Sequence, residues 1–363
     1  MKAIILHQSI VNHDAIGNDI ANMCHILSGI GYEPYVYGDF MVINSVRCAD
    51  RKQLKSIISN KDNLIVYHHS QYWKAGEDIL KEAKARIIFK YHNITPEQFF
   101  NGYSEEAAAK CNRGRKLTET LIQRHPTAYW TADSTYNLED LQAVNDERKI
   151  VVPPFANTEK WKDIVPDAAI LKELLENKDV NLLFIGRLAP NKGHAFILEV
   201  LRDYVVHYGR RIRLHVIGKI DNQNKYTREL NHVISRLGVA KNVRFEGEVN
   251  EEAVLAYYLG SDIYLSGSEH EGFCVPIIEA QFCRLPVVAR NTSAVAETLG
   301  PDQILLSEDI SEYSAAIKLL CTTSDYRDFI VEAGYRNYQT RFTNTIIAKR
   351  FKKAIAQATG AHL

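Results

Sequence analysis

Two glutamates in the segment 266–281, SGSEHEGFCVPIIEAQ, have a spacing that suits one ligand rich in hydroxyl groups. The run Asp262–Leu265 before them is short and apolar, which predicts a strand. Pro276 predicts a helix start, because the missing N–H of proline costs nothing in a first turn. Glu271 then falls in a strand-to-helix loop and Glu279 about two turns into the helix, roughly 5–10 Å away along its axis. Backbone N–H groups at the start of that helix suit an anionic or oxygen-rich ligand.

Two cations upstream predict a site for a diphosphate. The apolar run Asn181–Leu188 predicts a strand that ends in Gly186 and Arg187, and Lys192 follows five residues after Arg187. A glycine lets the backbone approach a ligand closely, and two fixed cations neutralise phosphate oxygens. Either motif alone is weak, since exposed charges in loops are common, but their order and separation strengthen the interpretation.

Taken together, the two motifs resemble those of the retaining GT-B glycosyltransferases of family 4, also called glycosyltransferase group 1. The resemblance implies that Arg187 and Lys192 hold the diphosphate of a nucleotide sugar and that Glu279 binds the ribose hydroxyls. It also implies that Glu271 holds the donor sugar. It further implies that the backbone of Gly272, Phe273 and Cys274 assists Glu271. The family has a glycine where this chain has Cys274.

Polar residues near strand ends in the first half of the chain are candidates for contacts with the acceptor and the donor sugar. Gly17 follows the first predicted strand and is the one position there that could allow close approach of a ligand. Asp14 could accept hydrogen bonds from acceptor hydroxyls, although capping of the next helix is an equal alternative. His68 and His92 follow two further strands, where ligands of doubly wound sheets bind. The resemblance places His92 beside the donor sugar, where its ring or backbone carbonyl stabilises positive charge.

Composition favours an ordinary two-domain protein. The 363 residues contain 44 basic and 44 acidic side chains, and this zero net charge argues against nucleic acid as a partner. The six cysteines form no C-x-x-C pair and indicate reduced thiols of a cytoplasmic protein. No segment approaches the ~20 apolar residues of a spanning helix, so at most we expect peripheral contact at the inner face of a membrane.

Alternating strand and helix patterns predict an α/β fold of GT-B type, with two Rossmann-like, doubly wound parallel-sheet domains facing a cleft. We expect an N-terminal acceptor domain over 1–155 and a nucleotide-sugar-binding domain over 156–342. The amphipathic segment 343–359 is expected to pack back on the first domain. Twelve strands are predicted, at 2–7, 33–37, 63–67, 86–91, 128–131, 149–152, 181–185, 213–217, 243–246, 262–265, 286–289 and 303–306.

The predicted activity is retaining, metal-independent transfer of a hexose from GDP-mannose or a UDP-hexose. The acceptor would be a glycan or lipid-linked sugar in lipopolysaccharide, capsule or other glycan synthesis. No cofactor is expected, because the nucleotide sugar is itself the donor substrate. The basic helix 107–124 could touch anionic lipid, although a solvated face is the commoner role of such a run. A nucleotide-sugar epimerase with His68 and His92 as its acid/base pair is an alternative, as is a non-enzymatic sugar-binding protein.

Overall fold

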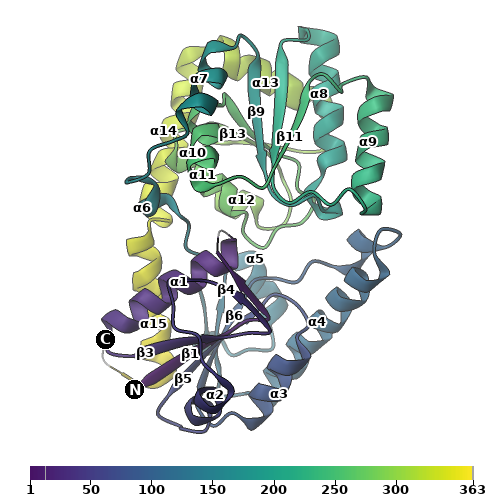
Figure 1. Ribbon diagram of the computed structural model, residues 1–363. Helices are drawn as coiled ribbons and strands as arrows, with labels where there is room; N and C mark the ends of the chain where they lie inside the picture. The colour runs from purple at the N-terminus through teal and green to yellow at the C-terminus, as the bar shows by residue number, and fades with distance from the viewer. Residues whose placement is uncertain (13, 362–363) are drawn as a thin grey trace. The chain divides into compact units, whose positions relative to one another are not determined.

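The computed structural model describes residues 1–12 and 14–361, and the chain divides into two compact units. Unit 1 comprises Met1–Gln98, Glu106–Ala156 and Asn344–Leu363. Unit 2 comprises Phe99–Glu105 and Asn157–Thr343, so a short segment from the first half of the chain clusters with the second unit. Each unit contains one six-stranded sheet with helices on both faces, as Figure 1 shows.

The sheet of unit 1 is entirely parallel and has the order β3-β1-β5-β6-β7-β8. The chain order therefore reverses between β1 and β5, and such a switch point is where doubly wound sheets bind ligands. Its strands are β1 (Lys2–Leu6), β3 (Glu33–Tyr37), β5 (Leu64–His69), β6 (Arg86–Tyr91), β7 (Tyr129–Ala132) and β8 (Lys149–Val151).

The sheet of unit 2 is also parallel and has the order β11-β10-β9-β12-β13-β14. Numbered within the unit this order is 3-2-1-4-5-6, that of a dinucleotide-binding Rossmann sheet, and its switch point lies between β9 and β12. The strands are β9 (Val180–Ile185), β10 (Ile212–Ile217), β11 (Val243–Gly247), β12 (Ile263–Ser266), β13 (Val287–Arg290) and β14 (Ile304–Leu306).

Alternating side chains of each strand supply two apolar cores, one on each face of the sheet. In β9, Leu182 and Phe184 pack into one core and Leu183 into the other. Burial on both faces explains why the strands are almost continuously apolar. The predicted twelve strands and the two parallel sheets are confirmed, with ends that differ by a residue or two.

A small parallel sheet was not predicted. It pairs β2 (Ser9–Val11) with β4 (Phe40–Val42), next to the loop that follows β1. Both strands have three residues, which is too short for an apolar alternation to stand out in the sequence.

Fifteen α-helices connect and cover the strands in the described residues. In unit 1 they are α1 (Ala15–Gly29), α2 (Arg51–Ile58), α3 (Lys74–Glu82), α4 (Glu105–Arg124), α5 (Thr135–Leu138) and α15 (Asn344–Thr359). In unit 2 they are α6 (Thr158–Trp161), α7 (Ala168–Glu176), α8 (His194–Tyr208), α9 (Lys225–Leu237), α10 (Glu251–Gly260), α11 (Val275–Phe282), α12 (Val295–Leu299), α13 (Ile310–Thr322) and α14 (Ser324–Arg341).

The last helix completes the core of unit 1 although it comes last in the chain. Ile347, Phe351 and Ile355 of α15 are fully buried in the core that also contains Ile20 of α1. At the far end of the helix, the Tyr129 hydroxyl donates to the Gln357 side chain. The apolar stripe of α15 is therefore used in packing against the sheet.

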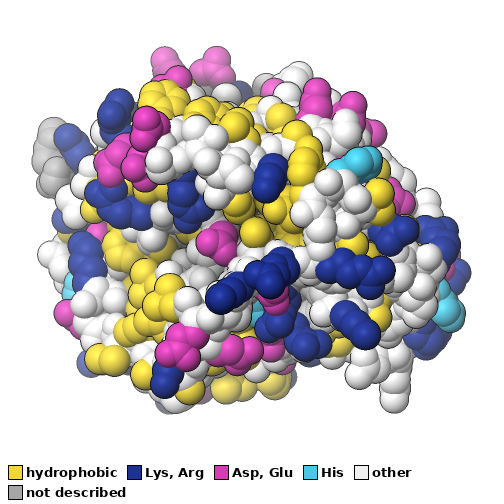
Figure 2. All heavy atoms as spheres, turned by 90° about the horizontal axis from the view of Figure 1, so that it is seen from above, with side chains coloured by type: hydrophobic (Ala, Val, Ile, Leu, Met, Phe, Trp, Pro, Cys, Tyr) yellow, Lys and Arg dark blue, Asp and Glu magenta, His cyan; other side chains and the backbone are white. Residues whose placement is uncertain are grey.

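Charged and apolar side chains are interspersed on the face of the molecule drawn in Figure 2, in keeping with the balanced charge of the sequence. No helix of the described chain is long and apolar enough to cross a membrane. All six cysteines are free thiols.

Removal of the central apolar side chain of α15 tests its share in the stability of unit 1. Phe351→Ala is expected to destabilise the fold by about 3–5 kcal/mol, because the deletion leaves a cavity in a closed core. Chemical denaturation monitored by circular dichroism measures the change. Lys353→Ala, at an exposed position of the same helix, is the control and should stay near wild type. Equal stability of both variants would contradict this role.

Candidate active site

The four charged residues predicted in the second half lie around the switch point of unit 2. Arg187 and Lys192 are in the loop after β9, and Glu271 is in the loop after β12. Because the two strands are neighbours and parallel, their carboxyl ends open at the same edge of the sheet. Glu279 lies in α11, the helix that follows the second loop.

Lys192 and Glu271 are in direct contact. The Lys192 ammonium donates to Glu271 Oε1 at 2.7 Å, and the Ser268 hydroxyl donates to the same oxygen at 2.7 Å. The Glu271 backbone N–H donates to the Ser293 hydroxyl at 2.8 Å, which fixes the loop from the other side. The carboxylate is only 9% exposed and Lys192 is 21% exposed, so the ion pair is held in a partly dry site where charge interactions strengthen.

The backbone geometry at two positions aligns these loops. Gly193 adopts φ 66°, and a Cβ there would lie 1.9 Å from the Gly267 carbonyl oxygen, so only glycine allows the two loops to touch. Cys274 caps the start of α11 with φ 75°, a left-handed conformation that favours glycine. Its side chain is buried in the apolar core with Ile277 and Tyr264, so it fills the interior beneath the helix.

Glu279 is partly buried on α11 and has one neutral partner. The Tyr258 hydroxyl donates to Glu279 Oε2 at 2.8 Å. Burial raises the pKa of Glu279 to about 7, and the hydrogen bond from Tyr258 opposes that shift. The carboxyl therefore titrates near neutral pH, and its ionised form is the one that can accept hydrogen bonds with both oxygens.

The remaining predicted residues of unit 2 divide into exposed and packed positions. Arg187 is exposed at the start of its loop, where it can reach a ligand. Phe273 is buried edge-to-face on Phe342, and its carbonyl accepts from the Thr298 hydroxyl at 2.6 Å. Gly272 is partly exposed between the acidic loop and α11. Packing of Phe273 thus fixes the start of the helix.

In unit 1, His68 and His92 form a hydrogen-bonded pair. His68 Nδ1 and His92 Nε2 are 2.8 Å apart, and the rings stack with centroids 4.9 Å apart. His92 Nδ1 donates to Asp133 Oδ2 at 2.9 Å, which assigns a proton to that nitrogen. The other ring nitrogen, Nε2, makes the hydrogen bond with His68 Nδ1. Both ring nitrogens of His92 are therefore occupied.

Two more buried charged groups complete the cluster. The Lys90 ammonium, which is fully buried, lies 2.5 Å from Asp133 Oδ1 and also donates to the Val152 carbonyl. Asp19 accepts the Phe155 N–H at 3.0 Å. Burial alone would raise the pKa of Asp133, but His92 and Lys90 hold it below its usual range. Burial raises the pKa of Asp19, and the charge of Lys90, which also pairs with Asp133, opposes that shift.

Asp14 and Gly17 have structural partners of their own. The Asp14 carboxylate accepts the Gly17 N–H at 2.6 Å and caps α1, the alternative that the sequence left open. A Cβ at Gly17 would lie 1.9 Å from the Val11 carbonyl oxygen. The glycine is therefore required for close contact with β2, and its role beside a ligand stays a prediction.

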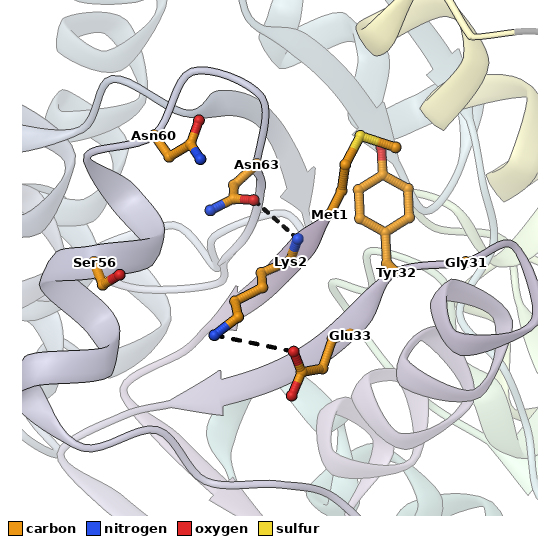
Figure 3. Close-up of a pocket in the computed structure, with 8 residues that line it drawn as sticks. All are labelled: Met1, Lys2, Gly31, Tyr32, Glu33, Ser56, Asn60 and Asn63. Atoms are coloured by element: carbon orange, nitrogen blue, oxygen red, sulfur yellow. Dashed lines mark hydrogen bonds and ion pairs between the residues drawn. The ribbon is translucent and has the colours of Figure 1, made fainter.

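The structure also contains a surface pocket of about 490 Å³ in unit 1, at the edge of the sheet where the strands begin. It lies at the amino ends of β1 and β3, with Lys2 between Asn63 and Glu33, as Figure 3 shows. None of the predicted site residues lines it. Its place at the amino ends of the strands argues against a substrate site, since ligands of such sheets bind at the carboxyl ends.

Comparison with known proteins agrees with this geometry. The architecture is that of a GT-B protein: the chain superposes on the Anabaena protein HepE in complex with UDP-glucose with a TM-score of 0.77 at 16% identity, over 98% of this chain and 99% of that one. The glycosyltransferase WaaG, involved in lipopolysaccharide biosynthesis, gives a TM-score of 0.69 at 14% identity, over 99% and 100% of the two chains. The predicted GT-B fold is confirmed.

Residues 167–337, just under half of the chain, match the family model of glycosyl transferases group 1. A curated relative, D-inositol 3-phosphate glycosyltransferase of Geodermatophilus obscurus, is 27% identical over 227 residues, which are 59% of this chain and 48% of the relative. The chain spans about half the length of the first curated relatives it matches. Over this matched region the predicted resemblance to glycosyltransferase group 1 is confirmed.

Sequence reasoning missed the residues that hold the predicted groups in place. In unit 2 these are Ser268, Ser293 and Tyr258, and in unit 1 they are Asp19, Lys90 and Asp133. Ser293 and Tyr258 carry no spacing signal, because their partners lie about twenty residues away in another loop or helix. A lysine inside the apolar strand RIIFKY was the one available hint, since a fully buried ammonium requires a buried carboxylate.

The pKa of Glu279 predicts how nucleotide binding depends on pH. If Glu279 binds ribose hydroxyls, the affinity for a free nucleoside diphosphate rises as the pH increases through about 7, because the carboxyl loses its proton and gains acceptor capacity. Tyr258→Phe removes the opposing hydrogen bond and shifts the midpoint upward. Isothermal titration between pH 6 and 8.5 measures both effects.

Glu279→Gln is the matched control, since it retains size but cannot ionise. Titration of the diphosphate itself affects wild type and variant alike, so only the difference between their profiles reports Glu279. Identical pH profiles for the two proteins would contradict the assignment to ribose.

Proposed function

We propose that this protein is a retaining glycosyltransferase that transfers a hexose from a nucleotide-diphosphate sugar to an acceptor hydroxyl. The observation that carries the proposal is the meeting of Lys192 and Glu271 at the switch point of unit 2, with Arg187 in the same loop and Glu279 on the following helix. The group 1 family match over 167–337 supports it, because the match contains all four residues.

In the proposed reaction the bond between the anomeric carbon and the diphosphate oxygen breaks. Arg187 and Lys192 stabilise the negative charge that develops on the leaving diphosphate. The acceptor hydroxyl attacks from the same face, a new bond forms between its oxygen and the anomeric carbon, and its proton passes to the departing phosphate oxygen. Two protein cations supply the charge that a metal supplies elsewhere, so we propose a step without metal or cofactor at the diphosphate.

The ion pair between Lys192 and Glu271 gives the two groups a joint role. Without substrate, the ammonium is neutralised by the carboxylate. A bound diphosphate competes for Lys192, and Glu271 is then available to accept a hydrogen bond from a sugar hydroxyl. Binding of the diphosphate thereby frees Glu271 to bind the sugar. The Lys192 ammonium and the Glu271 carboxylate each keep a polar partner both with and without substrate.

We assign the stabilisation of positive charge on the sugar to the backbone carbonyl of His92 and not to its ring. Because Asp133 and His68 take both ring nitrogens, the carbonyl of His92 is the group left to face positive charge on the sugar. Asn93, which follows, adopts φ 61°, a conformation that asparagine tolerates better than most residues. The turn at Asn93 sets the direction of the peptide group that carries this carbonyl.

The geometry of unit 1 does not favour the epimerase alternative. An acid/base pair must reach the substrate from two sides, whereas His68 is fully buried and bonded to His92. Burial also lowers the pKa of His68 well below its usual range, so it remains neutral and is a poor proton donor.

A UDP-hexose or GDP-mannose is the proposed donor, with UDP-glucose in the complex of HepE supporting the first. A glycan or lipid-linked sugar is the proposed acceptor, and the part that WaaG takes in lipopolysaccharide biosynthesis supports a role in surface glycans. We place the protein in the cytoplasm, with exposed Arg113 and Lys116 of α4 for peripheral contact with the inner face of a membrane. Two other cations of α4 are less available, since Arg115 pairs with Asp140 and Arg124 with Glu77.

Substitution of the two cations tests the leaving-group role. Lys192→Ala and Arg187→Ala are each expected to lower kcat by ~10²-fold or more, because each removes a charge that stabilises the departing diphosphate. Turnover of UDP-glucose and GDP-mannose with a sugar acceptor is the measurement, and NMR of the product shows whether the anomeric configuration is retained. Lys241→Ala, an exposed lysine of unit 2, should leave kcat unchanged.

An increase in KM alone would mean that the two cations only bind the ground state. An inverted product anomer would refute the retaining mechanism. If neither nucleotide sugar raises the melting temperature or is consumed, a different donor class must be sought.

A further inference from the structure

The buried cluster of unit 1 contains an arrangement that the transfer reaction does not require. Three potential metal-ligating side chains converge from different elements: Asp19 of α1, His68 at the end of β5, and His92 after β6. Their ligand atoms all lie within 4.8 Å of one another. Asp19 and the side chain of His68 are completely buried, and the side chain of His92 is 9% exposed.

One oxygen of this group has no partner. Asp19 Oδ1 accepts the Phe155 N–H, but no described residue donates a hydrogen bond to Asp19 Oδ2, which is shielded from solvent. His68 Nδ1 lies 4.0 Å from this oxygen. A buried carboxyl oxygen without a partner is costly, and this one lies within 4.8 Å of the ligand nitrogens of the two imidazoles.

The charge balance of the cluster indicates the same. Asp19 and Asp133 are two buried carboxylates, and Lys90 is the one buried ammonium beside them among the described residues. The cluster therefore holds more buried carboxylates than ammonium groups. Buried charges are normally paired or coordinate metals.

We propose that Asp19 Oδ2, His68 Nδ1 and His92 Nε2 bind a divalent transition-metal ion of the zinc type. Two imidazoles and one carboxylate form a ligand set that Zn²⁺ accepts, with a fourth position for water. His92 donates its other ring N–H to Asp133, the carboxylate–histidine arrangement that orients metal ligands. Asp19 is likewise held through its second oxygen by the Phe155 N–H.

Small shifts convert the present geometry into a tetrahedral one. Ligands at ~2.1 Å from an ion are about 3.4 Å from each other. The two ring nitrogens, now 2.8 Å apart, must separate, and the carboxylate oxygen, now 4.0 Å from His68, must approach. The proton on His68 Nδ1 moves to Nε2, a buried nitrogen without a described partner, so the ring stays neutral.

The ion would join α1 to the ends of β5 and β6, and so stabilise unit 1 and fix the His92 ring. All three ligands belong to unit 1, whereas the diphosphate groups are proposed in unit 2, so this inference does not depend on the proposed activity. It departs from the expectation of a metal-free protein that the family resemblance gave.

Metal loading of the purified protein after dialysis against EDTA tests the site. The expected results are one Zn²⁺ or Co²⁺ per chain, a higher melting temperature with Zn²⁺, and a visible absorption band of tetrahedral Co²⁺. Asp19→Asn and His68→Gln should weaken Co²⁺ binding by more than ~100-fold, and Asp133→Asn by ~10–100-fold, as expected for a residue that orients a ligand.

His207→Gln is the matched control. His207 lies 3.2 Å from Asp203 in an exposed histidine–carboxylate pair outside the cluster, so its loss should leave Co²⁺ binding unchanged. Absence of Co²⁺ binding by wild type would mean that a proton balances the cluster, and would overturn the proposal. Binding that survives Asp19→Asn and His68→Gln, or that is lost in His207→Gln, would do the same.

X-ray absorption of the zinc-loaded wild type keeps the test independent of whether the variants fold. Two imidazole nitrogens and light oxygen ligands in a four-coordinate shell are expected. A shell containing sulfur, or one without imidazole, would overturn the assignment.

Discussion

Everything proposed for this protein depends on one constraint: parallel strands begin at one edge of a sheet and end at the other. The loops after neighbouring strands therefore open side by side, however far apart they are in the sequence. Lys192 and Glu271 are 79 positions apart and still form a 2.7 Å ion pair, because β9 and β12 are adjacent. The same rule brings His68 and His92 together after β5 and β6.

The two units use this constraint in different ways. In unit 2 the strand ends carry charges that are partly exposed, with a neutralising partner that a ligand can replace. In unit 1 the strand ends carry charges that are almost fully enclosed, so the polar groups must satisfy one another. The partly exposed pair of Lys192 and Glu271 is proposed to open when a diphosphate binds, whereas loss of one partner from a fully buried pair is costly. The first arrangement suits binding and release, and the second suits a fixed scaffold.

The sequence predicted the fold and the charged residues of unit 2 because both depend on local patterns. Apolar runs such as NLLFIG and DIYL are four to six residues long and bounded by turn residues, so the strand positions were predicted to within a residue or two. Asn93 and Cys274, in left-handed conformations, and the pairing of β2 with β4 could not be predicted, because each is imposed by neighbours in space. The roles of Glu279 and Arg187 stay predictions, since ligand contacts alone define them.

The buried lysine of β6 shows where pattern reasoning ends. Lys90 lies within the predicted strand 86–91, yet its ammonium is buried and requires Asp133, which in turn orients His92. Removal of Lys90 would leave the buried Asp133 carboxylate without its ammonium partner, a cost of about 3–5 kcal/mol. The position of His92 therefore depends on a residue with which it has no direct hydrogen bond. The orientation of His92 at the end of the sheet is thus set by Lys90 and Asp133, two charged side chains buried beside the strands.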